Sequence, residues 1–252
     1  MKQKLLMGIL GVLLVIGGIA IGIQISSSAR PVVSEEPPVT DDGITIMCYG
    51  DSNTYGYNPE GGRYSKDERW PDILQELLGS KYHVILEGLN GRTTAFDPVN
   101  TFAWKNGAAH LDPILATNKL LNYIIFMLGT NDCKYTDDLS LEEITGGMEQ
   151  LIEQCEYLCP ILQDSMPQII LVSPPKIGDN VESTNAADEF DSSSIEKSVQ
   201  LAAEYEKLAK KHNCIFVSIT DIAEVSDIDG VHLTRDGQKT VAQELYKVIS
   251  GE

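Results

Sequence analysis

Short apolar runs alternate with longer amphipathic segments along most of the chain. The runs are rich in Ile, Val, Leu or Phe, are bounded by Gly, Pro, Asn or Asp, and lie near 44–49, 82–87, 122–128, 168–173 and 214–218. Runs of this length and composition predict buried β-strands. Because they are apolar on both faces, we expect them in a parallel sheet with helices on both sides.

Segments between and after these strands repeat apolar residues at helical spacing. They cover 65–79, 141–158, 195–212 and 234–249. Thr234 is a candidate N-cap for the last of them. The alternation predicts an α/β fold, a three-layer α/β/α domain around a five-stranded parallel sheet. Ligands bind at the carboxyl ends of the strands in such sheets, so the loops there should carry the chemistry.

The start of the chain has a different pattern. Residues 5–23 contain no charged or strongly polar side chain, and this run of 19 is close to the length of a membrane-spanning helix. We expect residues 1–25 to be an uncleaved membrane anchor. A cleaved signal peptide is the alternative, since small residues follow at 27–29, and a buried core helix is a third reading.

Two lysines precede the apolar run, which leaves the rest of the chain on the outer side of the cell membrane. Signal cleavage would instead make the protein secreted. Residues 26–43 are rich in Ser, Pro and acidic side chains and are expected to form a tether. The catalytic domain would then cover residues 44–252, and the membrane would be contacted through the N-terminal segment only.

The negative net charge limits the kinds of partner that the protein can bind. The formal net charge is -18, and the three basic residues before position 31 have no acidic counterpart, so the rest of the chain carries about -21. Nucleic acid and anionic membrane surfaces are poor partners for such a field, and a neutral or cationic substrate fits better. Solubility is an equally good reason for the charge, and the sequence leaves the oligomeric state open.

The cysteines indicate neither a metal site nor disulfides, and no cofactor-binding motif is present in the sequence. The five cysteines form no CxxC pair, and Cys155 and Cys159 are four apart on a predicted helix, which favours core packing over a metal site. No disulfide framework is indicated. No glycine-rich dinucleotide motif follows the first strand and no P-loop occurs, so we expect neither metal nor other cofactor.

The predicted loops hold residues suited to acyl transfer. "GDSN" with Ser52 follows the first strand, "GLNGRTT" the second and "GTND" with Asn131 the third, while "DGVH" with Asp229 and His232 precedes the last helix. Each motif alone is common: a serine after a strand is usually a cap or turn residue. Together they supply a nucleophile, a base, an orienting acid and oxyanion donors.

The order of these motifs resembles the SGNH (GDSL-type) hydrolase family. The stretches "GDSNTYGYNP", "ERWPDIL", "EGLNGRTT", "IIFMLGTND" and "VSPP" are similar to its arylesterase and acyltransferase branch, over residues 44 to 250. The resemblance implies flavodoxin-like topology, with Ser52 as nucleophile, His232 as base and Asp229 orienting it. It also implies an oxyanion hole made by the backbone N–H groups of Ser52 and Gly91 and the side-chain amide of Asn131.

Four further residues are candidates for substrate binding. Asn53 occupies a position where the family often has leucine, and it could border the acyl pocket or merely cap the following turn. Tyr57 and Trp104 could line the cleft, or could be packing aromatics. Arg92 could offer a polar contact at the cleft rim, or pair with a surface acid.

The sequence therefore predicts a serine esterase that hydrolyses short-chain, chiefly acetyl, esters through an acyl-enzyme intermediate. Given the expected location, the substrate would be a small ester or an acylated carbohydrate. Acyl transfer to an alcohol is an alternative that the residues do not distinguish. A non-catalytic surface-binding domain on the same fold is a rival from another class, although the complete set of motif residues argues against it.

Overall fold

The computed structural model describes residues 43–99 and 101–251. The predicted anchor over 1–25 and the predicted tether as far as residue 42 lie outside these residues. Within the part of the chain that is described, no helix is long and apolar enough to span a membrane.

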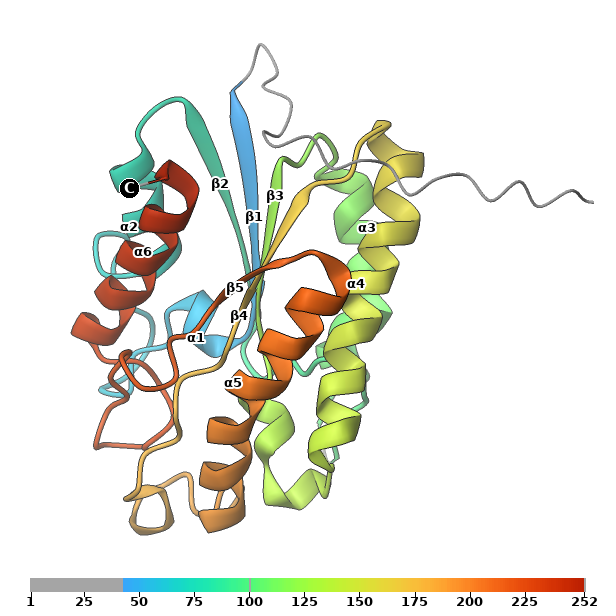
Figure 1. Ribbon diagram of the computed structural model, residues 1–252. Helices are drawn as coiled ribbons and strands as arrows, with labels where there is room; N and C mark the ends of the chain where they lie inside the picture. The colour runs from blue at the N-terminus through green and yellow to red at the C-terminus, as the bar shows by residue number, and fades with distance from the viewer. Residues whose placement is uncertain (1–42, 100, 252) are drawn as a thin grey trace, which may run out of the picture. The chain divides into compact units, whose positions relative to one another are not determined.

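The centre of the domain is one parallel sheet of five strands (Figure 1). The strands are β1 (Ile44–Gly50), β2 (Tyr82–Gly88), β3 (Tyr123–Met127), β4 (Gln168–Val172) and β5 (Ile215–Val217). All neighbours pair in parallel in the order β2-β1-β3-β4-β5. The expected sheet is confirmed, and its strands lie within two residues of the predicted bounds.

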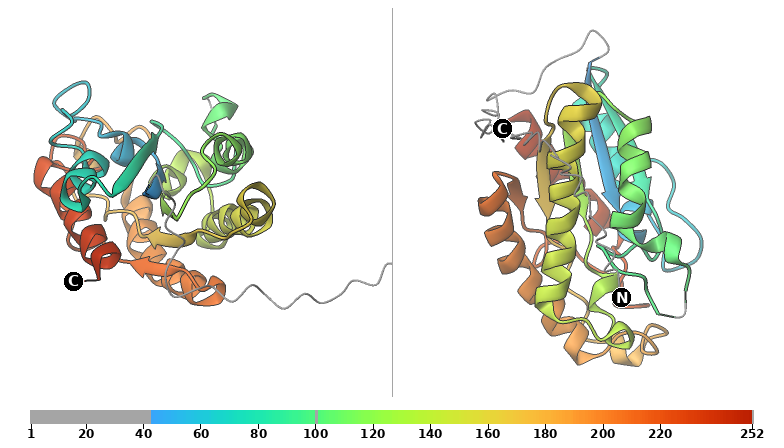
Figure 2. Two further views of the ribbon diagram at one scale, coloured as in Figure 1. Left: turned by 90° about the horizontal axis from the view of Figure 1, so that it is seen from above. Right: turned by 90° about the vertical axis from the view of Figure 1, so that its right-hand side faces the viewer.

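Helices cover both faces of the sheet (Figures 1 and 2). One face carries α3 (Gly107–Thr117), α4 (Leu141–Gln163) and α5 (Ser192–His212), and the other carries α2 (Trp70–Leu78) and α6 (Arg235–Ser250). Shorter elements are α1 (Ser52–Tyr55) and the 3-10 helices η1 (Ala103–Lys105), η2 (Asn131–Cys133), η3 (Tyr135–Asp137) and η4 (Val181–Ser183).

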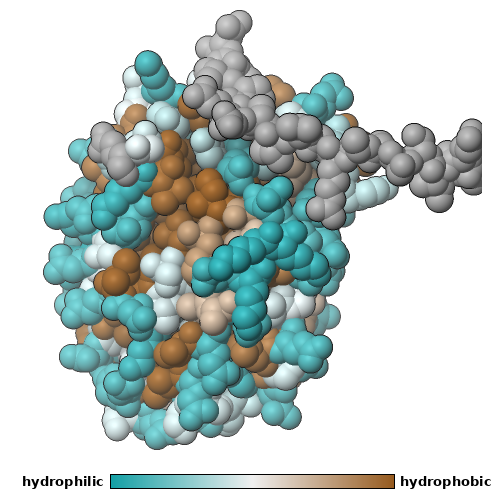
Figure 3. All heavy atoms as spheres, viewed as in Figure 1, coloured by the Kyte–Doolittle hydropathy of each residue, from teal (hydrophilic) through white to brown (hydrophobic). Residues whose placement is uncertain are grey.

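Alternate residues of the strands enter separate cores. In β1, Met47 and Tyr49 pack with the α3–α5 side, whereas Ile46 and Cys48 pack with the α2–α6 side. Successive side chains of a strand point to opposite faces, so a doubly covered strand must be apolar throughout. Figure 3 shows mainly hydrophilic residues on the outer helix surfaces, with hydrophobic residues between α6 and α5.

The helices differ from the predicted ones at three places. The segment 65–79 is helical only from Trp70, because Ser65 and Glu68 close a turn before it through the Glu68 carboxylate. The helix α4 runs on to residue 163. The helix α3 was not predicted, since it contains Pro113 and its apolar pattern is short. Thr234 does cap α6, where its hydroxyl accepts the N–H of Gly237 at 3.0 Å.

All five cysteines are free, and four are buried. Cys155 and Cys159 belong to the core on the α3–α5 side. Their predicted role in packing is confirmed.

Candidate active site

The turn that holds Ser52 is built at the carboxyl end of β1. Asp51 caps the short helix α1, and its carboxylate accepts the N–H of Asn53 at 2.8 Å. Gly88, at the end of β2, lies under this turn: a Cβ there would come within 2.3 Å of the backbone nitrogen of Tyr55. The glycine lets the serine turn pack directly on the sheet. Ser52 is 6% exposed.

Asp229 and His232 form one local unit in the loop before α6. One carboxylate oxygen of Asp229 accepts the backbone N–H groups of Val231 and His232 at 2.9 and 3.0 Å. The other faces His232 Nδ1 at 2.8 Å. Burial works against ionisation of Asp229, but the hydrogen bonds from the ring and the backbone outweigh it and lower its pKa below the ordinary value.

The fold brings this loop against the serine turn. His232 Nε2 lies 2.9 Å from Ser52 Oγ, although the two residues are 180 positions apart in the chain. A continuous series of contacts therefore runs from the Asp229 carboxylate through the imidazole to the hydroxyl. Such a series can move the serine proton to the ring while the carboxylate stabilises the imidazolium.

The residues expected to form the oxyanion hole come from the loops after β1, β2 and β3. Gly91 has a φ of +79°, a conformation that glycine adopts without strain. The amide nitrogen of Asn131 donates one hydrogen to the Arg92 carbonyl at 3.1 Å, which leaves its second hydrogen for a ligand. Within the described residues, no hydrogen bond uses the backbone N–H of Ser52 or Gly91. In the part of the chain that the structure describes, each of these three groups therefore has a hydrogen available to donate.

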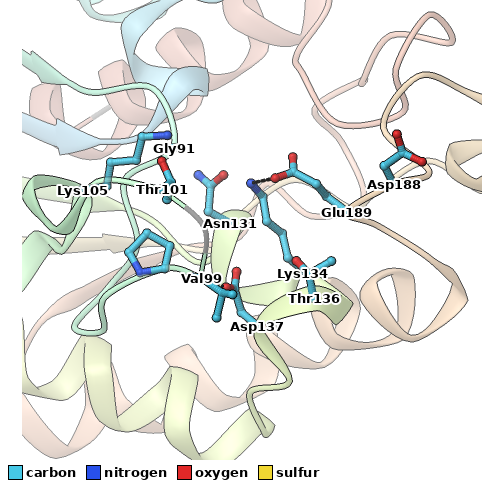
Figure 4. A pocket seen from close by; sticks show the side chains of 11 residues that line it. Gly91, Val99, Thr101, Lys105, Asn131, Lys134, Thr136, Asp137, Asp188 and Glu189 are labelled. Carbon is cyan, nitrogen blue, oxygen red and sulfur yellow. Dashed lines mark hydrogen bonds and ion pairs between the residues drawn. The ribbon is translucent and has the colours of Figure 1, made fainter.

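A cavity of about 320 Å³ opens next to these donors (Figure 4). Its lining includes Gly91 and Asn131 from the oxyanion set. The others come from the loop before α3, from the loops around η3 and from the loop before α5: Pro98, Val99, Thr101, Lys105, Lys134, Thr136, Asp137, Asp188 and Glu189. Sequence reasoning missed this lining, because no motif marks it.

Two carboxylates are buried beneath the site. Burial raises the pKa of Asp51 to about 6, against hydrogen bonds from Asn53 and Thr130 that lower it. Burial likewise raises the pKa of Asp132 to about 7, although Thr94 donates both its hydroxyl and its backbone N–H to that carboxylate. Both aspartates belong to quoted motifs, Asp51 to "GDSN" and Asp132 to "GTND", but the sequence did not indicate their burial.

Asn53 is buried next to the nucleophile. It is 1% exposed. Its side-chain oxygen accepts the N–H of Leu233 at 2.9 Å, and its amide nitrogen lies 3.4 Å from the carbonyl of Val231. Both ends of the amide hold the loop of His232, a role that neither expected reading, the border of the acyl pocket or the cap of the following turn, had given it.

Arg92 is also buried, with 5% of its surface exposed. Its guanidinium donates to the carbonyl oxygens of Gly50, at 2.8 Å, and of Glu87, and lies 3.9 Å from the centre of the Tyr49 ring. The expectation of a rim contact or a surface ion pair is therefore wrong. Arg92 joins the ends of β1 and β2 and presents its own carbonyl to Asn131.

The two aromatic candidates have different surroundings. The ring of Tyr57 lies against that of His232, with 4.3 Å between their centres. Trp104 is 47% exposed and stacks on Phe102 at 5.2 Å, and it does not belong to the cavity lining. Of the pair, only Tyr57 is brought to the site.

A parallel sheet with this serine, histidine and aspartate at its carboxyl edge defines a carboxylic ester hydrolase of the SGNH class. The chain matches the GDSL-like lipase/acylhydrolase family over residues 48–240, and it belongs to that family. A search of curated proteins finds no match.

Solved structures agree with the family assignment. A carbohydrate acetylesterase family member from Sinorhizobium meliloti is 37% identical with a TM-score of 0.75, over 82% of this chain and 98% of that chain. A second carbohydrate acetylesterase from Sinorhizobium meliloti is 30% identical with a TM-score of 0.74, over 82% of this chain and 99% of that one. An aryl esterase from M. smegmatis is 29% identical with a TM-score of 0.75, over 83% of this chain and 99% of that one.

Proposed function

We propose that the protein hydrolyses short-chain esters, chiefly acetyl esters on carbohydrate, through an acyl-enzyme formed on Ser52. The observation that carries this proposal is the contact of His232 with Ser52 Oγ on one side and with Asp229 on the other. The carbohydrate and acetyl parts rest on the similarity to carbohydrate acetylesterases.

In the proposed first step, Ser52 Oγ attacks the ester carbonyl carbon while His232 Nε2 takes the hydroxyl proton. The carbonyl oxygen gains the electron pair of the broken π bond and is stabilised by N–H donors of Ser52, Gly91 and Asn131. His232 then returns the proton to the alcohol oxygen as the carbon–oxygen bond breaks. The acyl group remains on Ser52 and the alcohol leaves.

In the second step, water replaces the alcohol. It attacks the acyl carbon while His232 accepts its proton, and that proton passes to Ser52 Oγ when the acyl–oxygen bond breaks. Carboxylic acid and free enzyme result. Transfer to a second alcohol would follow the same course, and the geometry does not favour it over water.

The test uses the full chain with p-nitrophenyl acetate, butyrate and octanoate, and with Ser52→Ala as the control. We expect kcat/KM to fall with chain length and Ser52→Ala to lose nearly all turnover. A fluorophosphonate should label the native chain and leave Ser52→Ala unlabelled. Absence of both turnover and labelling in the native chain would favour the rival binding-domain function.

The location of the domain is a further part of the proposal. The apolar run at 5–23, with lysines before it, supports an uncleaved anchor over 1–25, a tether over 26–43 and a catalytic domain outside the membrane. Protease added to intact cells should remove the domain from the surface. A domain that stays protected until the cells are opened contradicts this placement, and one found in the medium indicates signal cleavage.

A further inference from the structure

Among the residues that the structure describes, one cation in the cavity beside Gly91 and Asn131 has no ion-pair partner. Lys105 is half-buried at the end of η1, and its Nζ lies so near Gly91 that a Cβ on that glycine would be 2.7 Å away. Within the described residues, the ammonium makes no hydrogen bond and no ion pair, and the centre of the Trp104 ring is 6.0 Å from it.

Of the other charged groups that line the cavity, three make contacts of their own, and the fourth, the Asp188 carboxylate, lies beyond Glu189 as seen from Lys105 in Figure 4. Lys134 pairs with Glu189 at 2.9 Å, and the Asp137 carboxylate accepts the N–H of Val99 at 2.8 Å. Figure 4 shows Asn131 between Lys105 and the Lys134–Glu189 pair, so this pair does not neutralise Lys105 by contact.

The surroundings make this ammonium receptive to an anion. Burial and the charge of Lys134 lower the pKa of Lys105, against the opposing effect of Glu189. A bound anion would restore part of the solvation that the ammonium loses in the cavity. The rest of the molecule is strongly acidic, so a local cation is what would allow an anionic substrate to approach at all.

The size of the cavity indicates which part of an ester it takes. An acetyl group fills only a small part of about 320 Å³, so the space suits the alcohol part. Resting on the proposed function, we propose that Lys105 binds an anionic group on the alcohol part of the ester. The substrates are then acetyl esters of acidic alcohols, and the carboxylate of an acidic sugar is the chemical class that fits.

The experiment compares two acetate esters that differ in charge, 4-acetoxybenzoate and 4-acetoxybenzamide, on the full chain. Lys105→Met should lower kcat/KM for the benzoate about threefold to fivefold relative to the benzamide, as expected for a partly exposed charge pair, and Lys105→Glu should lower it further. Lys119→Met is the matched control, because Lys119 is exposed and precedes β3, at the opposite edge of the sheet.

Added salt should reduce the preference of the native chain for the benzoate, since the ammonium is only half-buried. A third ester, 4-acetoxybenzenesulfonate, separates the sources of the negative charge. Equal sensitivity of the sulfonate to Lys105→Met indicates a site for any anion, and sensitivity of the benzoate alone indicates a carboxylate site. Both results support the proposal.

The proposal is overturned if Lys105→Met lowers turnover of both esters equally, because Lys105 would then act on the reaction rather than on substrate charge. The proposal is also overturned if Lys105→Met keeps full activity and an unchanged ratio of kcat/KM for the benzoate to that for the benzamide. Thermal unfolding of each variant shows whether a loss of kcat/KM comes from misfolding. If Lys105→Met is misfolded, the ratio of kcat/KM for the benzoate to that for the benzamide in Lys105→Glu decides. Failure of the proposed function looks different: the native chain would not hydrolyse the neutral ester in a Ser52-dependent way, which removes both proposals.

Discussion

The side-chain oxygen of Asn53 accepts the backbone N–H of Leu233 at 2.9 Å. Its amide nitrogen lies 3.4 Å from the carbonyl of Val231, so one side chain holds the backbone on both sides of His232. Asn53 itself follows Ser52 in the chain. Together with the N–H of Ser226, which donates to the His232 carbonyl at 2.8 Å, this amide holds the base next to the nucleophile.

Asn53→Leu should lower kcat at least tenfold with little change in KM. Leucine cannot bond to either backbone group, and each buried group left without a partner costs about 1–3 kcal/mol. The loop of His232 should then relax away from Ser52. Steady-state kinetics, the rate of fluorophosphonate labelling and thermal unfolding measure the effects.

Asn58→Leu is the matched control for this variant, since the side-chain oxygen of Asn58 accepts the N–H of Glu60, two residues further along the chain, far from His232 in the sequence. It should keep native kinetics. A lower melting temperature for Asn53→Leu with unchanged kcat and labelling rate would show that Asn53 stabilises the fold without positioning the base.

Asp229→Asn should reduce kcat by about 10⁴-fold, the loss expected when the imidazole takes the wrong tautomer. One oxygen of Asp229 already accepts the N–H groups of Val231 and His232. An asparagine would keep its oxygen there and turn its NH₂ toward His232 Nδ1, so Nε2 would carry the ring proton and could not accept the one from Ser52. A loss below tenfold, with unfolding unchanged, speaks against Asp229 as the orienting acid.

Asp132→Asn should change how stability depends on pH. The carboxyl of Asp132 has an ordinary pKa of 3.8, which burial raises to about 7 in the folded protein. The unfolded chain therefore releases this proton before the folded one does, and the stability that the neutral carboxyl contributes is complete below pH 3.8 and lost as pH rises to about 7.

Since asparagine does not ionise, the Asp132→Asn variant should gain stability relative to the native chain over that range, by roughly 4 kcal/mol in total. Denaturant unfolding between pH 4 and pH 8 measures the difference, with Asp67→Asn, at an exposed position, as the control. If the difference in unfolding free energy between the variant and the native chain stays constant from pH 4 to pH 8, the Asp132 carboxyl is ionised in the folded protein over that whole range.

Gly88→Ala should disturb the nucleophile turn, because its Cβ would lie 2.3 Å from the nitrogen of Tyr55, a backbone atom that cannot rotate away. We expect lower stability by about 1–3 kcal/mol, the usual cost of overpacking, together with lower kcat. Gly146→Ala is the control: it lies on α4 with nothing within 4 Å, and alanine there should stabilise by about 0.5–1 kcal/mol. Native stability and kcat in Gly88→Ala would mean that the turn moves freely.

The amino-acid sequence by itself predicted the sheet and the reactive pair. Strands such as β1 carry apolar side chains toward both faces because both faces are covered, and this pattern is visible without coordinates. Asp229 and His232 are three residues apart, so their contact belongs to a single loop. Ser52 and Asn131 follow strands, and parallel strands bring their carboxyl ends to one edge.

The tertiary structure alone decided which polar side chains face the cavity. Asn53 and Arg92 had the residue types of substrate contacts, but their partners, Leu233 for one and Gly50 for the other, are distant in sequence and turn them inward. Lys105 belongs to no motif, and its ammonium lies in the cavity because its loop folds against Gly91. The direction and burial of a side chain depend on residues far along the chain, so the local periodicity of the sequence does not determine them.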